Sequence, residues 1–339
     1  MTLVFIGGGL GPPGSLTFEA VEALKKCDIV YVDCYTSVWD DETLQHVRKL
    51  VKVFVKAERK TLEDEAYRLV AEATDKVVGV LAPGDPFIAT THSSLRELAS
   101  RRKVKVEIVN GVSIISAAIS LSGLHVYKFG KTATLPKTDD LEQYRHPLHV
   151  LEENLSRHAH TLFLLDTAED GLTVPEAIRK LILAARKMGK NFVDDHTLAI
   201  SLARVGYLNS VVRAGTFEQL CLENYPPPPH CLIIPSAMHF SEKEAVKTYA
   251  INPDEMEKIK PVNPLSERLS TYIDKCRRFI EHASQNESLK QYVNYVNCYV
   301  DDAVRFMSSG DYVDALLSAG YAEGLLDALR LRGEVSFEW

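Results

Sequence analysis

Residues 81–92 carry the residue types and spacing that most directly suggest a binding site. They read L-A-P-G-D-P-F-I-A-T-T-H and directly follow a predicted strand. Gly84 and Pro86 favour a sharp turn, and a threonine of the same run can cap the next helix. Ligands of open α/β sheets bind beyond the carboxyl ends of the strands. Asp85 is therefore a candidate binding residue, because an acid on such a turn has no evident role in a core.

A glycine-rich loop after the first predicted strand offers a competing interpretation. Gly9-Leu-Gly-Pro-Pro-Gly14 matches G-x-G-x-x-G, and Asp33 at the end of the next strand could bind a ribose. In dinucleotide sites, free backbone N–H groups at a helix start face the pyrophosphate. Pro12 and Pro13 have no N–H to donate. A dinucleotide site is thus the weaker alternative, and a tight turn without a ligand is also open.

Composition restricts the partners of this chain. Its 339 residues, 46% of them hydrophobic, suffice for two or three domains with cores of their own. The net charge of -7 and the pI near 5.9 argue against a broad nucleic-acid surface, so DNA is not an expected partner. No apolar run approaches the roughly 20 residues that span a bilayer, and the N-terminal run does not resemble a signal peptide. We expect a cytoplasmic protein without a membrane partner.

The cysteines show no spacing typical of a metal site. They form no C-x-x-C pair and no cluster with histidine, so we expect no metal and mostly buried, unpaired side chains. A disulfide stays open as an alternative. The six cysteines are Cys27, Cys34, Cys221, Cys231, Cys276 and Cys298.

Short apolar runs alternate with helical patterns over the first 130 or so residues, which indicates βαβ units and a largely parallel sheet. The runs predict strands at residues 3–7, 29–33, 51–55, 77–81 and 104–109. Three- and four-residue spacing predicts helices at 18–27, 43–50, 62–74 and 93–102. A capping box from Thr61 to Asp64 is expected to start the third helix. Asp85 and the glycine-rich loop then follow parallel strands.

A second mixed lobe and a helical tail are expected beyond residue 130. Residues 130–147 mix charge, proline and polar side chains, and we interpret them as a linker between lobes. Strands are predicted at 161–165, 197–205 and 231–235, a helix at 175–188, and tail helices at 265–283, 289–308 and 312–331. The expected domains are an N-terminal α/β lobe (1–134), a C-terminal α/β lobe (135–255) and an all-α appendage (256–339).

An ordered series of segments resembles the tetrapyrrole methylase superfamily over residues 1–255. The similarity is strongest to members that modify translation elongation factor 2. An aromatic N-W-F-P-T-S-like segment, expected from the resemblance, is missing from residues 135–149, so substrate recognition is expected to depart from the family there. The matching segments are F-I-G-G-G-L (5–10), Y-T-S (35–37), G-D-P-F-I-A-T-T-H (84–92), S-I (113–114), G-L-H-V-Y-K-F-G-K-T-A-T (123–134), H-T (160–161), L-D (165–166), L-A-R-V-G (202–206), R-A-G (213–215) and P-H (229–230).

The resemblance implies two α/β lobes that hold S-adenosylmethionine in the cleft between them, with S-adenosylhomocysteine as product. It implies methylation of the amino group of a modified histidine on elongation factor 2, on the way to diphthamide, by a homodimer. Apolar members of the implied contact set can equally fill a core, Ser113 can cap a helix, and His230 can be a hydrogen-bonded histidine at a strand end. The implied cofactor contacts are Leu10, Asp85, Ile88, Ser113, Ile114, Leu165, Val205 and His230.

The expected chemistry needs no dedicated catalytic pair. An amine with a pKa near 8 is already partly neutral at cellular pH, and positioning supplies much of the rate. The catalytic residues are therefore unassigned, with Asp85 as the candidate that assists proton removal or holds the ammonium. Tyr35 and Tyr127 are candidates to cover a quaternary ammonium with an aromatic face.

Two alternatives stay open beside this function. One is methylation of a ring carbon in a porphyrin-type substrate, which calls for basic residues to meet the substrate's carboxylates. The other is a non-catalytic nucleotide-binding module. The helical tail resembles a small archaeal helical domain without an assigned role, which favours an archaeal source.

Overall fold

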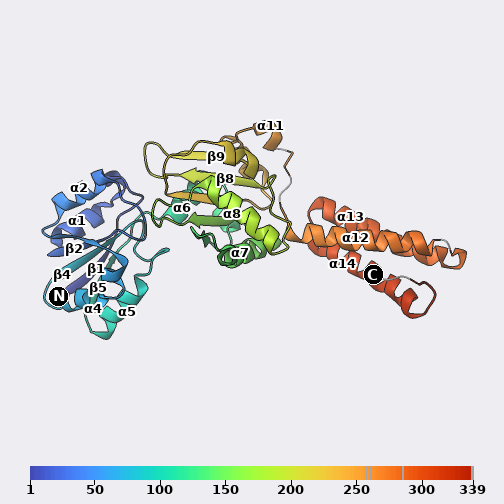
Figure 1. The fold of residues 1–339 in the computed structure, drawn as a ribbon, viewed down its shortest axis with the longest axis horizontal. Coiled ribbons are helices and arrows are strands. Elements are labelled where there is room, and N and C mark those ends of the chain that lie inside the picture. Colours follow the sequence, from blue (N-terminus) through green and yellow to red (C-terminus); the bar gives the residue numbers. More distant parts are fainter. Residues whose placement is uncertain (257, 260–261, 285, 337–339) are drawn as a thin grey trace. The chain divides into compact units, whose positions relative to one another are not determined.

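Two compact units make up the protein, residues 1–261 and 262–339 (Figure 1). The computed structural model describes residues 1–256, 258–259, 262–284 and 286–336. The first unit contains two five-stranded sheets with helices, and the second contains helices. The fold is therefore two α/β lobes followed by a helical unit, as the resemblance implied. The C-terminal end of the expected appendage, residues 337–339, lies outside the described residues.

The first sheet is parallel throughout, in the order β3-β2-β4-β1-β5. Its strands are β1 (Thr2–Gly7), β2 (Ile29–Asp33), β3 (Phe54–Ala57), β4 (Val77–Ala82) and β5 (Lys105–Val109). The connecting helices are η1 (Pro13–Ser15), α1 (Phe18–Lys26), α2 (Asp41–Leu50), α3 (Arg59–Leu62), α4 (Ala66–Glu72) and α5 (Ser93–Arg101).

Helices cover both faces of this sheet, so its central strands are buried throughout. Consecutive strand residues point to opposite faces. Phe5 of β1 packs with Leu69 of α4 and Leu95 of α5, while Ile6 packs with Leu24 of α1. The apolar runs that predicted strands in the sequence are thus the two-sided core of the first lobe.

The second sheet has the order β6-β7-β10-β8-β9, and only its β6–β7 pair is parallel. Its strands are β6 (Ala133–Leu135), β7 (Thr161–Leu165), β8 (Leu198–Ala203), β9 (Val211–Thr216) and β10 (His230–Ile234). The helices of this region are α6 (Ile114–Ser122), η2 (Val126–Lys128), η3 (Leu141–Tyr144), α7 (Arg145–Ser156), α8 (Val174–Lys187), α9 (Phe217–Leu222), α10 (Phe240–Lys247) and α11 (Pro253–Met256).

The linker predicted at residues 130–147 is wrong. This stretch contains β6, η3 and the start of α7, and its side chains Leu135 and Tyr144 are fully buried. Asn154 of α7 donates to the backbone oxygen of Lys131 and accepts from its N–H, which fixes the chain before β6. The sequence pattern misled because β6 has three residues and Pro147 lies in the first turn of α7, where proline is tolerated.

The capping box predicted at Thr61 is also wrong. Thr61 lies inside α3, a single turn that ends at Leu62, and α4 starts only at Ala66. The apolar positions Leu62, Ala66 and Leu69 all face the core, so their spacing resembled one continuous helix although the chain breaks between two short ones.

The second unit is built from α12 (Pro264–Ala283), η4 (Glu287–Leu289), α13 (Lys290–Ser309) and α14 (Tyr312–Leu331). Leu269, Phe279, Val296 and Leu326 belong to its shared core. Gly310 adopts a left-handed conformation (φ 85°) at the end of α13, as a helix end often requires. The three long helices therefore form a bundle with a core separate from those of the sheets.

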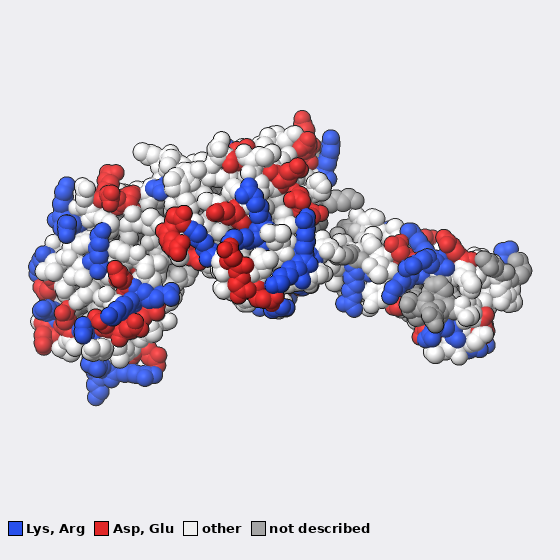
Figure 2. All heavy atoms as spheres, in the orientation of Figure 1, with Lys and Arg blue, Asp and Glu red and all other residues white. Residues whose placement is uncertain are grey.

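Charged side chains of both signs share the face of the molecule drawn in Figure 2. On the face drawn in Figure 2, Lys and Arg side chains are interspersed with Asp and Glu over residues 1–261. Within the described residues, no helix has both the length and the apolar composition needed to cross a bilayer.

Candidate functional site

The glycine-rich loop after β1 is joined to the G-D-P loop after β4. Gly9 and Gly84 exchange two backbone hydrogen bonds, with N···O distances of 3.1 and 2.8 Å. Gly7 lies so close to Gly111 that a Cβ on Gly7 would come within 2.3 Å of the Gly111 nitrogen. Only glycine fits such a backbone approach. Three loops therefore meet at the carboxyl edge of the first sheet.

Asp85 is buried and fixes this junction, which corrects the expectation that an acid on this turn has no role in a core. Its side chain is only 5% exposed. The carboxylate accepts hydrogen bonds from Phe87 N (3.0 Å), Asn110 Nδ2 (2.9 Å) and Gly111 N (3.3 Å). Asp85 thus holds its own turn and the loop after β5, and it brings a negative charge to the cavity described below.

The far end of the G-D-P loop is held by a buried pair. His92 lies 2.9 Å from the Pro86 oxygen through Nδ1 and 3.2 Å from Asp33 Oδ2 through Nε2. Burial would raise the pKa of Asp33, but hydrogen bonds from His92, Thr36 and the backbone of Tyr35 together lower it. Asp33 therefore helps to hold the loop 81–92 through His92. Its side chain is fully buried, so it is not available to bind a ribose.

A cavity of about 220 Å³ opens beside these loops, within residues 1–261. All eight residues that the resemblance implied as cofactor contacts line it, and both loops after strands of the first sheet and strands of the second sheet contribute. They are Leu10, Asp85, Ile88, Ser113, Ile114, Leu165, Val205 and His230.

The lining also includes residues that we did not single out in the sequence. Thr36, Ser37, Thr134 and Asp166 belong to the segments Y-T-S, T-A-T and L-D, so the family pattern could have indicated them. Val38, Thr167 and Cys231 lie next to such segments, and nothing in their own residue type marks them.

The carboxylates that line the cavity have no basic side chain beside them in the described lining. Asp85 and Asp166 line it, and none of the described residues that line it is Lys or Arg. The Asp166 carboxylate accepts hydrogen bonds from the backbone N–H groups of Lys137 (3.1 Å) and Ala168 (2.9 Å), which fix its turn. Such an environment favours a cationic ligand over a phosphate or a polycarboxylate.

Two of the predicted contacts use their side chains within the protein. Ser113 Oγ accepts from Ile115 N at 3.2 Å and so caps α6. His230 Nδ1 accepts from Val174 N (3.3 Å), and its Nε2 donates to the Pro226 oxygen (2.8 Å). Burial lowers the pKa of His230, so the ring is neutral at pH 7. Both residues can meet a ligand through their backbone and their shape.

Loops of the two lobes touch at the rim of the cavity. A Cβ on Gly206 would lie 2.6 Å from Leu10 Cβ, and a Cβ on Gly11 would lie 2.0 Å from the Tyr207 hydroxyl. Thr167 Oγ1 donates to the Thr36 oxygen at 3.1 Å. These contacts leave no room for larger residues and close the cavity on two sides.

A second, more open cavity of about 610 Å³ shares Ser37, Val38 and Thr167 with the first. Tyr35 lines it, with its hydroxyl bonded to Thr91 (2.6 Å), and the Arg59 guanidinium lies 5.5 Å from its ring centre. Tyr127, the other aromatic candidate, is almost fully exposed on η2 and lines neither cavity.

The dinucleotide alternative does not fit the glycine-rich loop. Helix α1 begins at Phe18, beyond the G-x-G-x-x-G run, and Thr17 caps it by accepting from Ala20 N at 3.0 Å. The helix start therefore does not face the cavity edge at Gly9 and Leu10, where a pyrophosphate would need its N–H groups.

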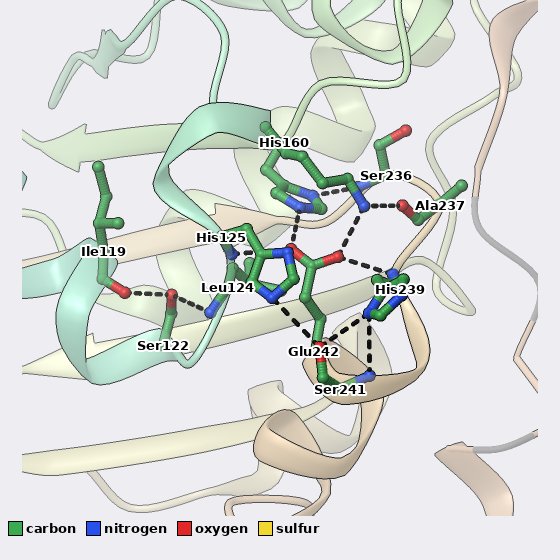
Figure 3. Close-up of polar contacts among 11 residues, drawn as sticks. Ile119, Ser122, Leu124, His125, His160, Ser236, Ala237, His239, Ser241 and Glu242 are labelled. Atoms are coloured by element: carbon green, nitrogen blue, oxygen red, sulfur yellow. Dashed lines mark hydrogen bonds and ion pairs between the residues drawn. The ribbon is translucent and has the colours of Figure 1, made fainter.

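A buried polar cluster lies around Glu242, outside the cavity lining (Figure 3). Its carboxylate accepts from Lys128 Nζ (2.6 Å), His160 Nε2 (3.1 Å) and the backbone N–H groups of His125 and His239. Burial would raise the pKa of Glu242, but these hydrogen bonds together lower it to about 2. The cluster fixes the segment that carries Y-K-F-G-K against α10, which explains that segment without a catalytic role.

Neither this cluster nor another suggests a metal centre. Across the described part of the chain, no group of three or more His, Cys, Asp and Glu side chains is arranged to hold a metal ion. The cysteine side chains are unpaired, and Cys27, Cys231 and Cys276 are buried.

Comparisons with known proteins agree with the fold and the loops. Residues 2–221 match the family described as tetrapyrrole (corrin/porphyrin) methylases, and residues 266–334 match a family described as a protein of unknown function, DUF357. The diphthine synthase of Staphylothermus marinus is 40% identical over 244 residues, which are 70% of this chain and 89% of that protein. The diphthine synthase of Methanopyrus kandleri is 39% identical over 254 residues, with 72% and 94% covered.

A solved structure gives the same result in three dimensions. A crystal structure of diphthine synthase superposes with a TM-score of 0.69 at 33% identity, covering 76% of this chain and 100% of that chain. The remainder of this chain has no counterpart in that structure.

Proposed function

This chain belongs to the tetrapyrrole (corrin/porphyrin) methylase family, and on that premise we propose that it is a methyltransferase of diphthamide biosynthesis, the activity for which its relatives are named. The proposed methyl donor is S-adenosylmethionine, and the proposed acceptor is the amino group of the modified histidine on translation elongation factor 2. The observation that supports this methyl donor is the composition of the cavity lining. It includes two carboxylates and, among its described residues, neither Lys nor Arg.

The lining also separates this function from the dinucleotide alternative. A dinucleotide carries two phosphates, which would meet the like charges of Asp85 and Asp166. A sulfonium carries a positive charge and is attracted by them. The apolar side chains Leu10, Ile114 and Val205 suit the uncharged parts of a nucleoside. A methylase of porphyrin-type rings would use the same donor, so the names of the relatives, and not the lining, favour the diphthamide reaction.

We assign the eight predicted contacts to the donor by position and chemistry. The apolar members shape the cavity, and Ser113 and His230 present backbone groups, because their side chains are bonded within the protein. Asp85 orients the loops and supplies charge. Its three hydrogen bonds leave it a poor candidate to take a proton.

In the proposed reaction the chain acts by positioning. S-adenosylmethionine, when bound, supplies a methyl group whose bond to sulfur breaks as a bond to the acceptor nitrogen forms. The rigid loops at Gly9, Gly84 and Gly111 hold the donor side, and the contacts at the rim limit access of water. The acceptor amine loses its proton to solvent before attack, since its pKa is near 8.

The second cavity is the proposed entrance for the protein substrate. It joins the first through Ser37, Val38 and Thr167, and it is open enough for a side chain presented by another protein. Tyr35 lies in its wall, but the Arg59 guanidinium is already 5.5 Å from the centre of its ring, so we assign no aromatic face to the methylated ammonium.

We further propose that the protein is archaeal, acts in the cytoplasm, where translation takes place, and forms a homodimer as the resemblance implies. In functional terms, we divide it into lobes at 1–134 and 135–255, which share the cavity, and an appendage at 256–339. None of the appendage's described residues is among those that line either cavity.

Methyl transfer to the factor itself tests this function. Elongation factor 2 that carries the diphthamide precursor is incubated with the protein and isotopically labelled S-adenosylmethionine, and intact mass and peptide spectra count the added methyl groups. Label is expected on the modified histidine, and factor without the precursor is the control. Label on neither, or equal label on both, would contradict the proposal.

A further inference from the structure

Helix α14 of the second unit carries an uncharged stripe on its exposed side. The residues recur at three- and four-residue spacing, so they lie along one face of the helix. Its four large side chains are between 52% and 74% exposed. The α14 stripe consists of Val313, Leu317, Tyr321, Gly324, Ala328 and Leu331, all exposed.

The stripe lies outside the core of the bundle, although the Tyr321 ring also contacts Tyr299 of α13, with ring centres 4.6 Å apart. The opposite side of α14, with Ala315, Ala322 and Leu326, is buried in the core shared with α12 and α13. The helix is therefore apolar on both sides, a pattern typical of helices that are covered all round. A continuous exposed apolar patch of this kind marks an interaction surface.

The glycine within the stripe supports a close approach by another helix. Gly324 lies in the interior of α14, where glycine is less favourable than alanine. A Cβ on Gly324 would meet no atom within 4 Å, so packing inside the bundle does not require glycine there. A small residue in the middle of the stripe instead leaves room for a large side chain from outside.

We propose that the α14 stripe binds the same stripe of a second copy of this chain, with the two helices antiparallel. In this arrangement Leu317 lies opposite the partner's Ala328, and Tyr321 lies opposite the partner's Gly324. Both pairs are centred between residues 322 and 323, as a two-fold axis requires. Each pair sets a large side chain against a small one.

The charges at the edge of the stripe favour the antiparallel direction. Asp314 and Arg332 are 18 residues apart, which is five helical turns, so they flank the same edge at opposite ends. Antiparallel packing sets this edge against the same edge of the partner and brings Asp314 close to the partner's Arg332, whereas parallel two-fold packing sets it against the opposite edge, where this pair does not form. Arg332 pairs with Glu334 at 2.8 Å, but its side chain is still 75% exposed and accessible to a second carboxylate.

Disulfide trapping in the full chain tests the pairing independently of the proposed function. The variant carries Leu317→Cys and Ala328→Cys together with Cys298→Ser, which removes an exposed native cysteine. Within one helix these positions are about 16 Å apart, too far for a disulfide. A bond between them, identified by peptide mass spectrometry after mild oxidation, must therefore join two copies, and it is the expected product.

The matched control replaces Ala328→Cys by Arg330→Cys, which is equally near the helix end but lies off the stripe. It should give at least tenfold less cross-linked product. Adding Gly324→Leu to the trapping variant should lower the yield by a similar factor without loss of helical circular dichroism, since the added side chain has space in the single chain.

Three outcomes would overturn the proposal. Bonds between two copies of residue 317 would indicate parallel packing. Product no more abundant than in the Arg330→Cys control would mean that the first unit or another protein covers the stripe. An unchanged yield with Gly324→Leu would contradict the register.

Discussion

Both carboxylates of the cavity are held by uncharged donors, which is why their charge is available to a ligand. Asp85 accepts from an amide side chain and backbone N–H groups, and Asp166 accepts from backbone N–H groups. Lys137, close in sequence to this site, directs its ammonium to Asp170 instead. An acid that fixes a loop without a basic partner keeps its negative potential in a partly enclosed space.

A lysine in the cavity wall should therefore weaken binding of the methyl donor. Ile88→Lys places a like charge beside the sulfonium, and at about 6 Å and an effective dielectric constant of about 20 the repulsion is roughly 2–3 kcal/mol. We expect the Kd for S-adenosylmethionine, measured by calorimetry, to rise at least about tenfold. Ile108→Lys is the matched control, because the two isoleucines are similarly exposed, at 41% and 37%, and only Ile88 lines the cavity. Equal affinities in both variants would contradict the electrostatic argument.

Glu242 should make the stability of the first unit depend on acid pH. A folded-state pKa of about 2, below the usual 4.5, means that the carboxylate stabilises the fold above pH 4.5 and that this stability is lost as the pH falls towards 2. Burial also lowers the pKa of His160 from its usual 6.5. The unfolded chain therefore binds a proton there before the folded chain does, and the free energy of unfolding begins to fall below pH 6.5.

Glu242→Gln should lower the free energy of unfolding at pH 7 by roughly 2–4 kcal/mol, because Lys128 loses its charged partner and an NH2 group that cannot accept replaces one of the two oxygens that Lys128 and His160 contact. The unfolding free energy of the variant, from urea titrations between pH 2 and 7, should also fall less below pH 4.5. Glu244→Gln, an exposed neighbour on α10, should change it by less than about 0.5 kcal/mol. A variant as pH-dependent as the wild type would show that the cluster does not determine acid stability.

At the scale of elements, strands buried on both faces and long amphipathic helices were predictable. β2 and β7 have the predicted bounds, as does α14, because uninterrupted apolar runs or regular spacing leave little choice. β6 was missed because it has three residues, and α7 because its first turn contains Pro147. α3 and α4 were merged because both bury their apolar positions in one core. Local patterns do not report such tertiary constraints.

The site was predictable to the extent that its residues lie in ordered motifs. All eight predicted residues line one cavity because they lie in strands of the second sheet or in segments that follow strands. The hydrogen bonds of Asp85 and His230 within the protein could not be predicted, since Asn110, Gly111 and Val174 are distant in sequence.

In the loop after β1, a side chain at Gly11 should destabilise the fold, whereas a side chain at Gly14 should be tolerated. Gly11 has φ 119° and faces Tyr207, so Gly11→Ala forces the rim contact to open. We expect a loss of roughly 1–3 kcal/mol in unfolding free energy and weaker S-adenosylmethionine binding. Gly14→Ala in the same loop meets no atom within 4 Å and should change neither quantity. Equal effects of the two substitutions would show that the Gly11–Tyr207 approach is not important.

At the scale of the whole molecule, the two units have separate cores. The cores of residues 1–261 contain both sheets, and the core of the second unit contains residues from Leu269 to Val335. A solved diphthine synthase is matched over its full length by 76% of this chain. The cavity is therefore expected to be complete without the helical unit.

Truncation after residue 261 tests this independence. The shortened chain should fold cooperatively and bind S-adenosylmethionine within about twofold of the full chain, since every residue that lines the cavity is retained. It should also lose the cross-link between residues 317 and 328, which lie in the removed part. A fragment that is folded but binds the donor more than tenfold more weakly would show that the second unit contributes to the site.

Calorimetric titration of the full chain with S-adenosylmethionine and, separately, with NAD tests the central claim most directly. The cavity with Asp85 and Asp166 and without basic side chains among its described lining residues should bind the sulfonium compound and leave NAD unbound at the same concentrations. Binding of NAD in preference to S-adenosylmethionine, or no binding of S-adenosylmethionine, would contradict the account.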